Sequence, residues 1–261
     1  MKTLTIVTLS TIIFTACQAT SLSVATDPTT VIKEIEQNNK ITKITIPSTT
    51  SQLIKVSTED WNTKDGKLQR YEKDKKGNWI KVGKEIKIVL GRNGLGWGLG
   101  LHTIPKDAKY IKKEGDGRSP AGLFSLGNGF GYKNFKINFP YAKYSRTDHC
   151  VDDSKSEFYN TIIDSKKVKK DYKSFEYMRL KNDLYKYGIT VNHNENQIAN
   201  AGSCIFVHIR SKSGKGTAGC TAMRENEIVK LLKWLKESKK PLLLQLPQNE
   251  AKKVITDYSL K

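Results

Sequence analysis

Alternation of apolar and polar residues dominates the stretch from Gln52 to Gly91 and limits what the chain can fold into. The alternating segments are QLIKVST (52–58), GKLQRYEK (66–73), GNWIKVG (77–83) and KEIKIVLG (84–91). A period of two sends successive side chains to opposite faces of a strand. Turn-forming residues such as Asp65-Gly66 and Gly77-Asn78 separate the segments, as in hairpins. The pattern therefore predicts a run of antiparallel hairpins and a fold that is mainly β.

The second half of the chain adds a few helices and more strands. Residues 189–194, 203–209 and 241–247 are apolar runs typical of buried strands. Residues 225–240 predict a helix with an apolar stripe formed by Ile228, Leu231, Leu232 and Leu235. Residues 174–188 predict a short helix that ends near Gly188. We expect a mainly β fold with a few helices, of the α+β class.

The first residues have the pattern of a bacterial export signal. Lys2 precedes an apolar run that ends in FTAC at Cys17 and is too short to span a bilayer comfortably. FTAC resembles a lipobox, in which the cysteine becomes the acylated first residue; ordinary cleavage after Ala16 or Ala19 is the alternative. We expect a signal peptide over 1–16, lipidation of Cys17, a polar tether over 17–50, a folded domain over 51–250 and a tail over 251–261.

These features predict where the protein works. Lipidation of Cys17 would anchor the chain to a membrane. Gln18, rather than Asp, follows that cysteine, which in a diderm host favours the outer membrane. We therefore expect an exported lipoprotein in the periplasm.

The charge balance predicts an anionic partner. The chain has 45 Lys and Arg against 26 Asp and Glu, a formal net charge of +19. The basic residues are scattered rather than clustered with aromatic residues, which argues against a nucleic-acid partner. The alternative is that the lysines only solvate the surface.

The segment FVHIRSKSGKGTAGCTAM (206–223) holds one of four histidines and one of four cysteines. His208 ends an apolar strand, and Cys220 follows Gly219, where the backbone can turn sharply. A neighbouring imidazole can activate a thiol, and backbone N–H groups at such a turn can hold an oxyanion. On these residues alone, a nucleophilic pair and a structural cysteine with a core histidine both remain open.

The same segment resembles the signature of the L,D-transpeptidase catalytic domain (YkuD-like) family. In that family a strand ends in His and a later Ser/Thr-x-Gly-Cys turn carries the nucleophile, as Thr217–Cys220 would here. GDGRSPAGLF (115–124) is similar to the second family marker, and CVDD, VNHN and GSCIFVH resemble one exported branch. The resemblance runs from about Gln52 to Pro247. It implies a β-sandwich or barrel catalytic domain, over 51–250, with N-terminal hairpins.

The resemblance also implies a reaction. Cys220 would attack the carbonyl of the third residue of a peptidoglycan tetrapeptide stem, releasing D-alanine, and an amine would resolve the acyl-enzyme. His208 would serve as base and then acid, with its ring oriented by the carbonyl of Ile209 or a neighbour. No metal or cofactor is implied. The acidic stem peptides would be the partner. The alternatives are a hydrolase on the same scaffold, an L,D-carboxypeptidase or endopeptidase, and a non-catalytic wall-binding lipoprotein.

Further site residues follow from the same motifs. Gly219 and Thr217 are candidates for the oxyanion site, and Ser119 for substrate binding. The family has an arginine soon after the cysteine, where this chain has Thr221 and Ala222, so Arg118, Arg210 or Arg224 would take that role. His193 is a candidate for substrate binding, with a core role as its alternative.

The remaining cysteines predict a disulfide. With Cys17 lipidated and Cys220 kept free, Cys150 and Cys204 remain in an oxidising compartment, where thiols tend to pair. The alternative is that both are buried and reduced. A zinc site built from these two cysteines with His149 and His193 is a further alternative, although no pair has C-x-x-C spacing.

Overall fold

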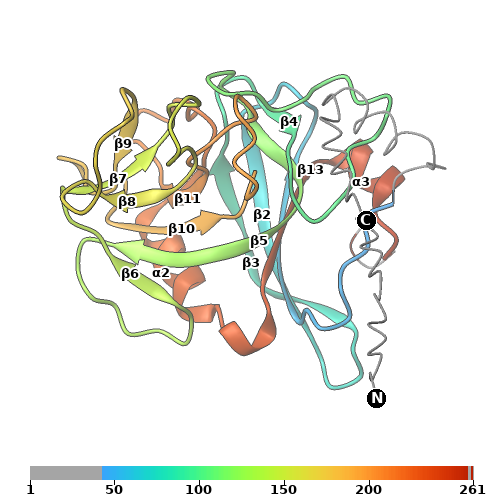
Figure 1. The fold of residues 1–261 in the computed structure, drawn as a ribbon. Helices are drawn as coiled ribbons and strands as arrows, with labels where there is room; N and C mark the ends of the chain where they lie inside the picture. The colour runs from blue at the N-terminus through green and yellow to red at the C-terminus, as the bar shows by residue number, and fades with distance from the viewer. Residues whose placement is uncertain (1–42, 258–259, 261) are drawn as a thin grey trace, which may run out of the picture. The chain divides into compact units, whose positions relative to one another are not determined.

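A closed ring of β-strands forms the centre of the fold. The computed structural model describes residues 43–257 and 260; the predicted signal peptide, Cys17 and most of the predicted tether lie outside the described residues. Around the ring the order is β5, β10, β11, β12, β3, β2, β1 and β13, and β13 pairs with β5 again. Closure leaves these strands without free edges, which is how barrels avoid edge-to-edge aggregation. Figure 1 shows the ring with β4 and β6 attached to β5.

The strand bounds are β1 Gln52–Thr58, β2 Asp65–Lys73, β3 Trp79–Val89, β4 Leu95–Trp97, β5 Ser119–Gly131, β6 Tyr141–Lys143, β7 Asp148–Val151, β8 Ile162–Asp164, β9 Phe175–Tyr177, β10 Tyr187–Val191, β11 Phe206–Ile209, β12 Thr221–Met223 and β13 Leu242–Pro247. The helices are α2 Glu225–Trp234, a 3₁₀ turn at Glu237–Lys239, and α3 Gln248–Val254. The prediction of a mainly β fold with a few helices is confirmed. No helix in the described part of the chain has the length and apolar character needed to cross a bilayer.

The predicted N-terminal hairpins are present. β1 pairs antiparallel with β2, and β2 pairs antiparallel with β3. The segments 77–83 and 84–91 were predicted as two strands separated by a turn at Gly83. In the structure they form the single strand β3, which continues through Gly83. Gly83 has φ of +70° and lies where the β2–β3 register shifts. Glycine adopts this left-handed conformation without steric cost, so it forms a bulge inside the strand.

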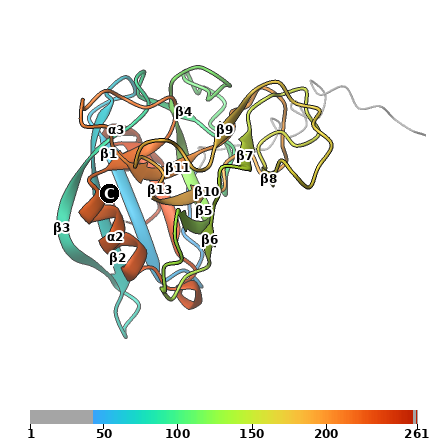
Figure 2. The ribbon, with the colours of Figure 1, turned by 90° about the vertical axis from the view of Figure 1, so that its left-hand side faces the viewer.

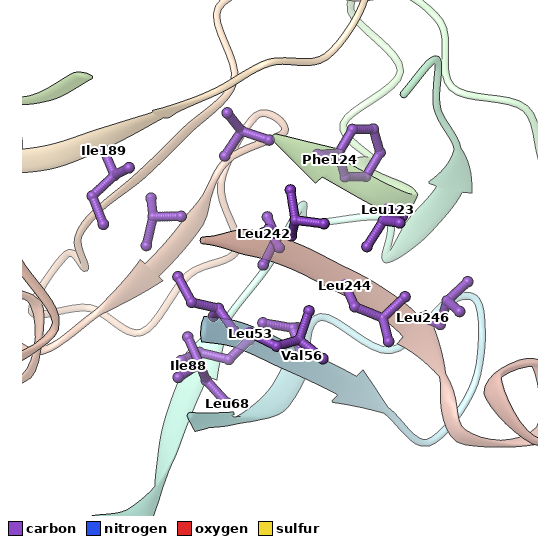
Figure 3. Packing of buried hydrophobic residues seen from close by; sticks show 14 of the residues in the cluster. Leu53, Val56, Leu68, Ile88, Leu123, Phe124, Ile189, Leu242, Leu244 and Leu246 are labelled. Carbon is purple, nitrogen blue, oxygen red and sulfur yellow. The ribbon is translucent and has the colours of Figure 1, made fainter. Parts of the chain in front are cut away.

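The core fills the space between the strands of the ring. Leu242, Leu244 and Leu246 are two residues apart along β13, so their side chains share one face of the strand. Figure 3 shows them packed with Leu53 and Val56 of β1. β13 is buried along its whole length, and β1 and β5 pair with its two edges.

Helix α2 covers β10 and β11 with its apolar stripe. The four predicted stripe residues, Ile228, Leu231, Leu232 and Leu235, are all fully buried. The helix is shorter than the predicted 225–240, since Leu235 already has an extended backbone (φ −61°, ψ 137°).

The predicted helix over 174–188 is wrong. The segment instead supplies β9 and the start of β10, joined by turns. Gly188 does not end a helix. It lies in β10 under the ring of Phe130, where an added Cβ would come within 2.2 Å of that ring. Pairing with the distant strand β5 and packing on Phe130 therefore determine this segment, and local spacing does not reveal either.

The two ends of the described chain join the fold beyond the predicted boundaries. Ile44, inside the predicted tether, forms a parallel bridge with Ile255, inside the predicted tail. Both side chains are buried in the core. The tail prediction also missed α3, which packs against β13. The folded part thus extends past 51–250 on both sides, because contacts between distant segments hold the ends.

Candidate active site

Strands β11 and β12 bring His208 and Cys220 together. The two strands are parallel neighbours, with His208 paired with Ala222. Cys220 immediately precedes β12 and so lies two positions along the pair from His208. Strand spacing and rise place their Cα atoms roughly 8 Å apart. The parallel pairing thus closes the loop of residues 210–220 and explains why the two residue types flank it.

The Cys220 thiol is enclosed by protein. The residue is only 6% exposed. The backbone N–H of Phe206 donates to its Sγ at 3.3 Å, and the thiol donates to the carbonyl of Cys204 at 3.5 Å. Burial, and then the charge of Glu176, raises the pKa of the thiol above its usual range, against the lowering effects of Phe206, Lys112 and Tyr185. The raised pKa favours the neutral thiol, and a thiol becomes a good nucleophile only after it loses its proton.

His208 is held as a neutral imidazole. Its Nδ1 lies 2.8 Å from the carbonyl oxygen of Ile209, so Nδ1 carries the proton. The backbone of Leu184 also interacts with the ring and, like Ile209, favours its protonated form. The family resemblance implied an orienting carbonyl from Ile209 or a neighbour. Burial lowers the pKa of His208 to about 4. A buried imidazolium is thus unfavourable until substrate or another charge compensates it.

Two hydroxyl groups fix the backbone of Cys220. Ser119 Oγ and Thr217 Oγ1 both donate to the carbonyl oxygen of Cys220, at 3.0 and 2.6 Å. Ser119 also accepts from the N–H of Gly91 at 2.8 Å. The N–H of Gly219 donates to Thr217 Oγ1 at 3.2 Å. Ser119 and Thr217 therefore position the Gly-Cys turn, and the oxyanion role of Gly219 stays a prediction.

The candidate arginines lie in different surroundings. The guanidinium of Arg118 donates to the carbonyls of Trp61 and Leu95, at 3.0 and 2.8 Å, and stacks over the Tyr110 ring. Arg210 is partly buried next to β11, and its N–H donates to the carbonyl of Met223. Arg224 precedes α2 as its N-cap residue. Arg118 thus ties the Gly-rich loops together, while substrate roles for Arg118, Arg210 and Arg224 stay predictions.

His193 connects two loops near the site. Its Nδ1 accepts from the N–H of Leu99 at 3.2 Å, and its Nε2 lies 3.0 Å from the carbonyl of Ala201. The side chain is buried, and burial lowers its pKa to about 4. Both ring nitrogens are occupied by backbone groups, an arrangement typical of a structural histidine.

A disulfide joins Cys150 of β7 to Cys204, next to β11, the strand that carries His208. This is the pairing that the sequence favoured, and it removes both sulfurs as zinc ligands. β7 is the middle strand of a small sheet with β8 and β9, and Cys150 faces Glu176 of β9 in register. Figure 1 and Figure 2 show this small sheet beside β10 and β11. The disulfide therefore holds the small sheet against the site.

Three residues near the thiol had no signal in the sequence pattern. Lys112 is 5% exposed, and its Nζ donates to Asp116 at 2.7 Å, with its side chain next to Gly219. Tyr185 packs edge-to-face on the His208 ring, with centroids 5.1 Å apart, and donates to Glu176 at 2.5 Å. The three residues are Lys112, Tyr185 and Glu176. They come from segments that are distant in sequence from the Gly-Cys turn, so only the folded chain brings them to the site.

The fold is a closed ring of β-strands, and two of its neighbouring strands bring His208 and Cys220 together. A comparison with known protein families points to the same class of protein. The family model for the L,D-transpeptidase catalytic domain (YkuD) matches residues 54–244, most of the chain. The protein belongs to this family, whose members act on peptidoglycan stem peptides. Neither the curated proteins nor the solved structures gave a match.

Proposed function

We propose that this protein is a peptidoglycan L,D-transpeptidase with Cys220 as its nucleophile. The thiolate attacks the carbonyl of the third residue of a tetrapeptide stem, and the terminal D-alanine leaves as an amine. A second amine, from another stem or a protein lysine, then attacks the thioester and regenerates the thiol. The observation that supports this best is the β11–β12 pairing, which sets His208 next to the Gly-Cys turn of a family member.

The surroundings of the two residues suit this chemistry. Because Nδ1 of His208 faces the carbonyl of Ile209, Nε2 is the nitrogen that exchanges protons with the reacting groups. Ser119 and Thr217 hold the carbonyl of Cys220, so the backbone around the nucleophile is already ordered before substrate binds. The buried ammonium of Lys112 favours negative charge on the sulfur or on the tetrahedral oxygen.

The net charge of +19 supports the substrate class. Stem peptides carry several carboxylates, and a basic protein attracts an acidic polymer and raises its local concentration.

The reaction is tested with purified protein and tetrapeptide muropeptides. We expect cross-linked dimers and free D-alanine from the wild type and neither product from Cys220→Ala. Tripeptides without dimers would show that water is the acceptor and that the protein is an L,D-carboxypeptidase. A Cys220→Ala variant that still releases D-alanine would contradict the proposal.

We also propose that the chain is exported and lipidated at Cys17. A disulfide between Cys150 and Cys204 supports an oxidising compartment. Metabolic labelling with a tagged fatty acid should mark the wild type and leave Cys17→Ser unlabelled. Equal labelling of both proteins would contradict lipidation at this residue.

A further inference from the structure

A cavity away from the candidate active site opens on the sheet formed by β1, β2 and β3. Its volume is about 250 Å³, and helix α3 contributes part of its lining. The polar residues that matter here are Lys55 and Ser57 of β1, Tyr71 of β2, Lys81 and Glu85 of β3, and Lys252 of α3. The cavity shares no lining residue with the surroundings of His208 and Cys220 described above.

The strand register explains why these groups meet. Lys55 and Ser57 are two residues apart on β1, so their side chains share one face. Lys55 pairs in register with Gln69 of β2, and Tyr71 pairs with Lys81 of β3. Residues opposite each other in antiparallel strands have neighbouring side chains on the same face. Groups from three strands therefore converge on the face that the cavity occupies.

The ammonium groups of the cavity have no anionic partner in the protein. Among the residues that the structure describes, Lys55, Lys81 and Lys252 form no ion pair. Glu85 instead pairs with Lys67, at 3.1 Å. Burial, and then the charge of Lys81, lowers the pKa of Lys55. The partly buried Lys55 is thus close to another cation, an arrangement that a bound anion would offset.

Two hydroxyl groups of the same cavity are also unpaired. Tyr71 is only 6% exposed, yet its hydroxyl forms no hydrogen bond within the described part of the chain. The hydroxyl of Ser57 likewise has no partner among the described residues. Polar groups of buried residues are normally hydrogen-bonded to protein or to a ligand or water. Both hydroxyls are therefore available as donors to a group in the cavity.

We propose that this cavity binds a phosphate group, held by Lys55, Lys81 and Lys252 and by the hydroxyls of Tyr71 and Ser57. The donors come from β1, β2, β3 and α3, so they approach the anion from several directions. A tetrahedral phosphate offers oxygens in such directions, and lysine binds it as a point charge. A planar carboxylate is matched best by the fork of an arginine, and no arginine lines this cavity. The site does not depend on the chemistry at Cys220.

A lipid headgroup or a soluble phosphate can supply this chemistry. The described chain begins beside α3, where the N–H of Ile44 donates to the carbonyl of Val254 at 2.7 Å. Lys43 Nζ donates to the carbonyl of Lys253 at 3.2 Å. The predicted lipid anchor at Cys17 precedes this point in the sequence, so the anchored chain would join the fold next to the helix that lines the cavity. Lysines near an anionic membrane surface also favour binding to it.

Isothermal titration calorimetry with inorganic phosphate tests the site. The protein is the full chain carrying Cys17→Ser, so that no acyl group contributes. We expect saturable binding and an affinity about 10-fold weaker in Lys55→Gln. Tyr71→Phe should also bind about 10-fold more weakly, although it changes no charge, because it removes a hydrogen bond to an ion. Acetate, a planar carboxylate, should bind more weakly than phosphate, and equal affinities would contradict a phosphate site.

Lys87→Gln is the matched control. Lys87 is an exposed lysine of β3 outside the cavity, so this variant loses the same charge and should keep wild-type affinity. A second measurement needs no substitution in the cavity: inorganic phosphate should slow the acylation of Lys55 by acetic anhydride, mapped by peptide mass spectrometry. The proposal is overturned if phosphate neither binds saturably nor protects Lys55. Equal phosphate affinity in the unsubstituted cavity, Lys55→Gln and Tyr71→Phe would overturn it as well.

Vesicles of phosphatidylglycerol distinguish the two sources. Cosedimentation of the Cys17→Ser chain that is lost in Lys55→Gln and in excess inorganic phosphate would assign a lipid headgroup to the cavity. Phosphate binding that depends on Lys55, without cosedimentation, would assign a soluble phosphate. Cosedimentation unchanged by Lys55→Gln, in a protein that binds no inorganic phosphate, would reflect the general positive charge and contradict the site.

Discussion

Removal of the Cys150–Cys204 disulfide should cost several kcal/mol of stability. The bridge closes a loop with a sequence separation of 54. Loop-closure entropy for that length corresponds to about 4 kcal/mol at room temperature, which is an upper value because native strain reduces it. Part of that strain is visible, since Cys204 has φ of +54°, a left-handed conformation unfavourable for a residue with a Cβ. We expect the double variant Cys150→Ala, Cys204→Ala to lose about 2–4 kcal/mol of unfolding free energy.

Urea denaturation of the oxidised wild type and of the double variant measures this loss. The variant with Cys204→Gly in place of Cys204→Ala is the matched control, because glycine adopts positive φ freely. It should be at least as stable as the alanine version. A loss below about 0.5 kcal/mol in the alanine variant would refute the claim that the bridge constrains the unfolded chain.

Three further predictions concern the site and its surroundings. Ser119→Ala should destabilise the fold by about 1–3 kcal/mol in urea denaturation, because it leaves the buried N–H of Gly91 unpaired. It should also lower turnover, because it removes a hydrogen bond to the carbonyl of Cys220. Unchanged stability would contradict the role of Ser119 in holding Gly91 and Cys220. Arg118→Ala should lower the melting temperature rather than raise KM selectively, since its guanidinium holds loop carbonyls; a KM effect alone would assign it to substrate. Stability should fall as pH drops from 6.5 to 4, because burial lowers the pKa of three histidines to about 4 and the unfolded chain then binds more protons. These are His102, His193 and His208. Burial raises the pKa of Glu176 to about 7, so between pH 7 and 4.5 the folded chain binds more protons there than the unfolded chain does. The contribution of Glu176 to stability therefore rises as pH falls, opposite to that of the histidines. Glu176→Gln should therefore steepen the acid loss in a melting-temperature series, and a flat series would contradict these shifts.

The sequence predicted the parts of the fold that depend on local patterns. The hairpins of residues 52–89 follow from period-two alternation, and the buried stripe of α2 follows from helical spacing. The helix predicted over 174–188 was wrong because the packing of Gly188 under Phe130 comes from a strand far away in the chain. The Ile44–Ile255 bridge was missed for the same reason.

The sequence predicted His208 and Cys220 of the candidate site, but not all the residues that surround them. His208 and Cys220 lie within one motif, so their proximity could be inferred from a short loop between two strands. The positions of Glu176, Tyr185 and Lys112 depend on how the small sheet and the Gly-rich loops pack on that motif. No spacing along the chain encodes such contacts, which follow from the closed fold.

Acyl-enzyme formation at Cys220 tests the central claim most directly. The purified protein is incubated with a tetrapeptide muropeptide or a carbapenem, and the adduct is located by intact-protein and peptide mass spectrometry. We predict one acyl group on the peptide that contains Cys220, none in Cys220→Ala, and acylation slower by about 10²–10⁴-fold in His208→Ala. An adduct of the same mass on Cys220→Ala would contradict the assignment of the nucleophile.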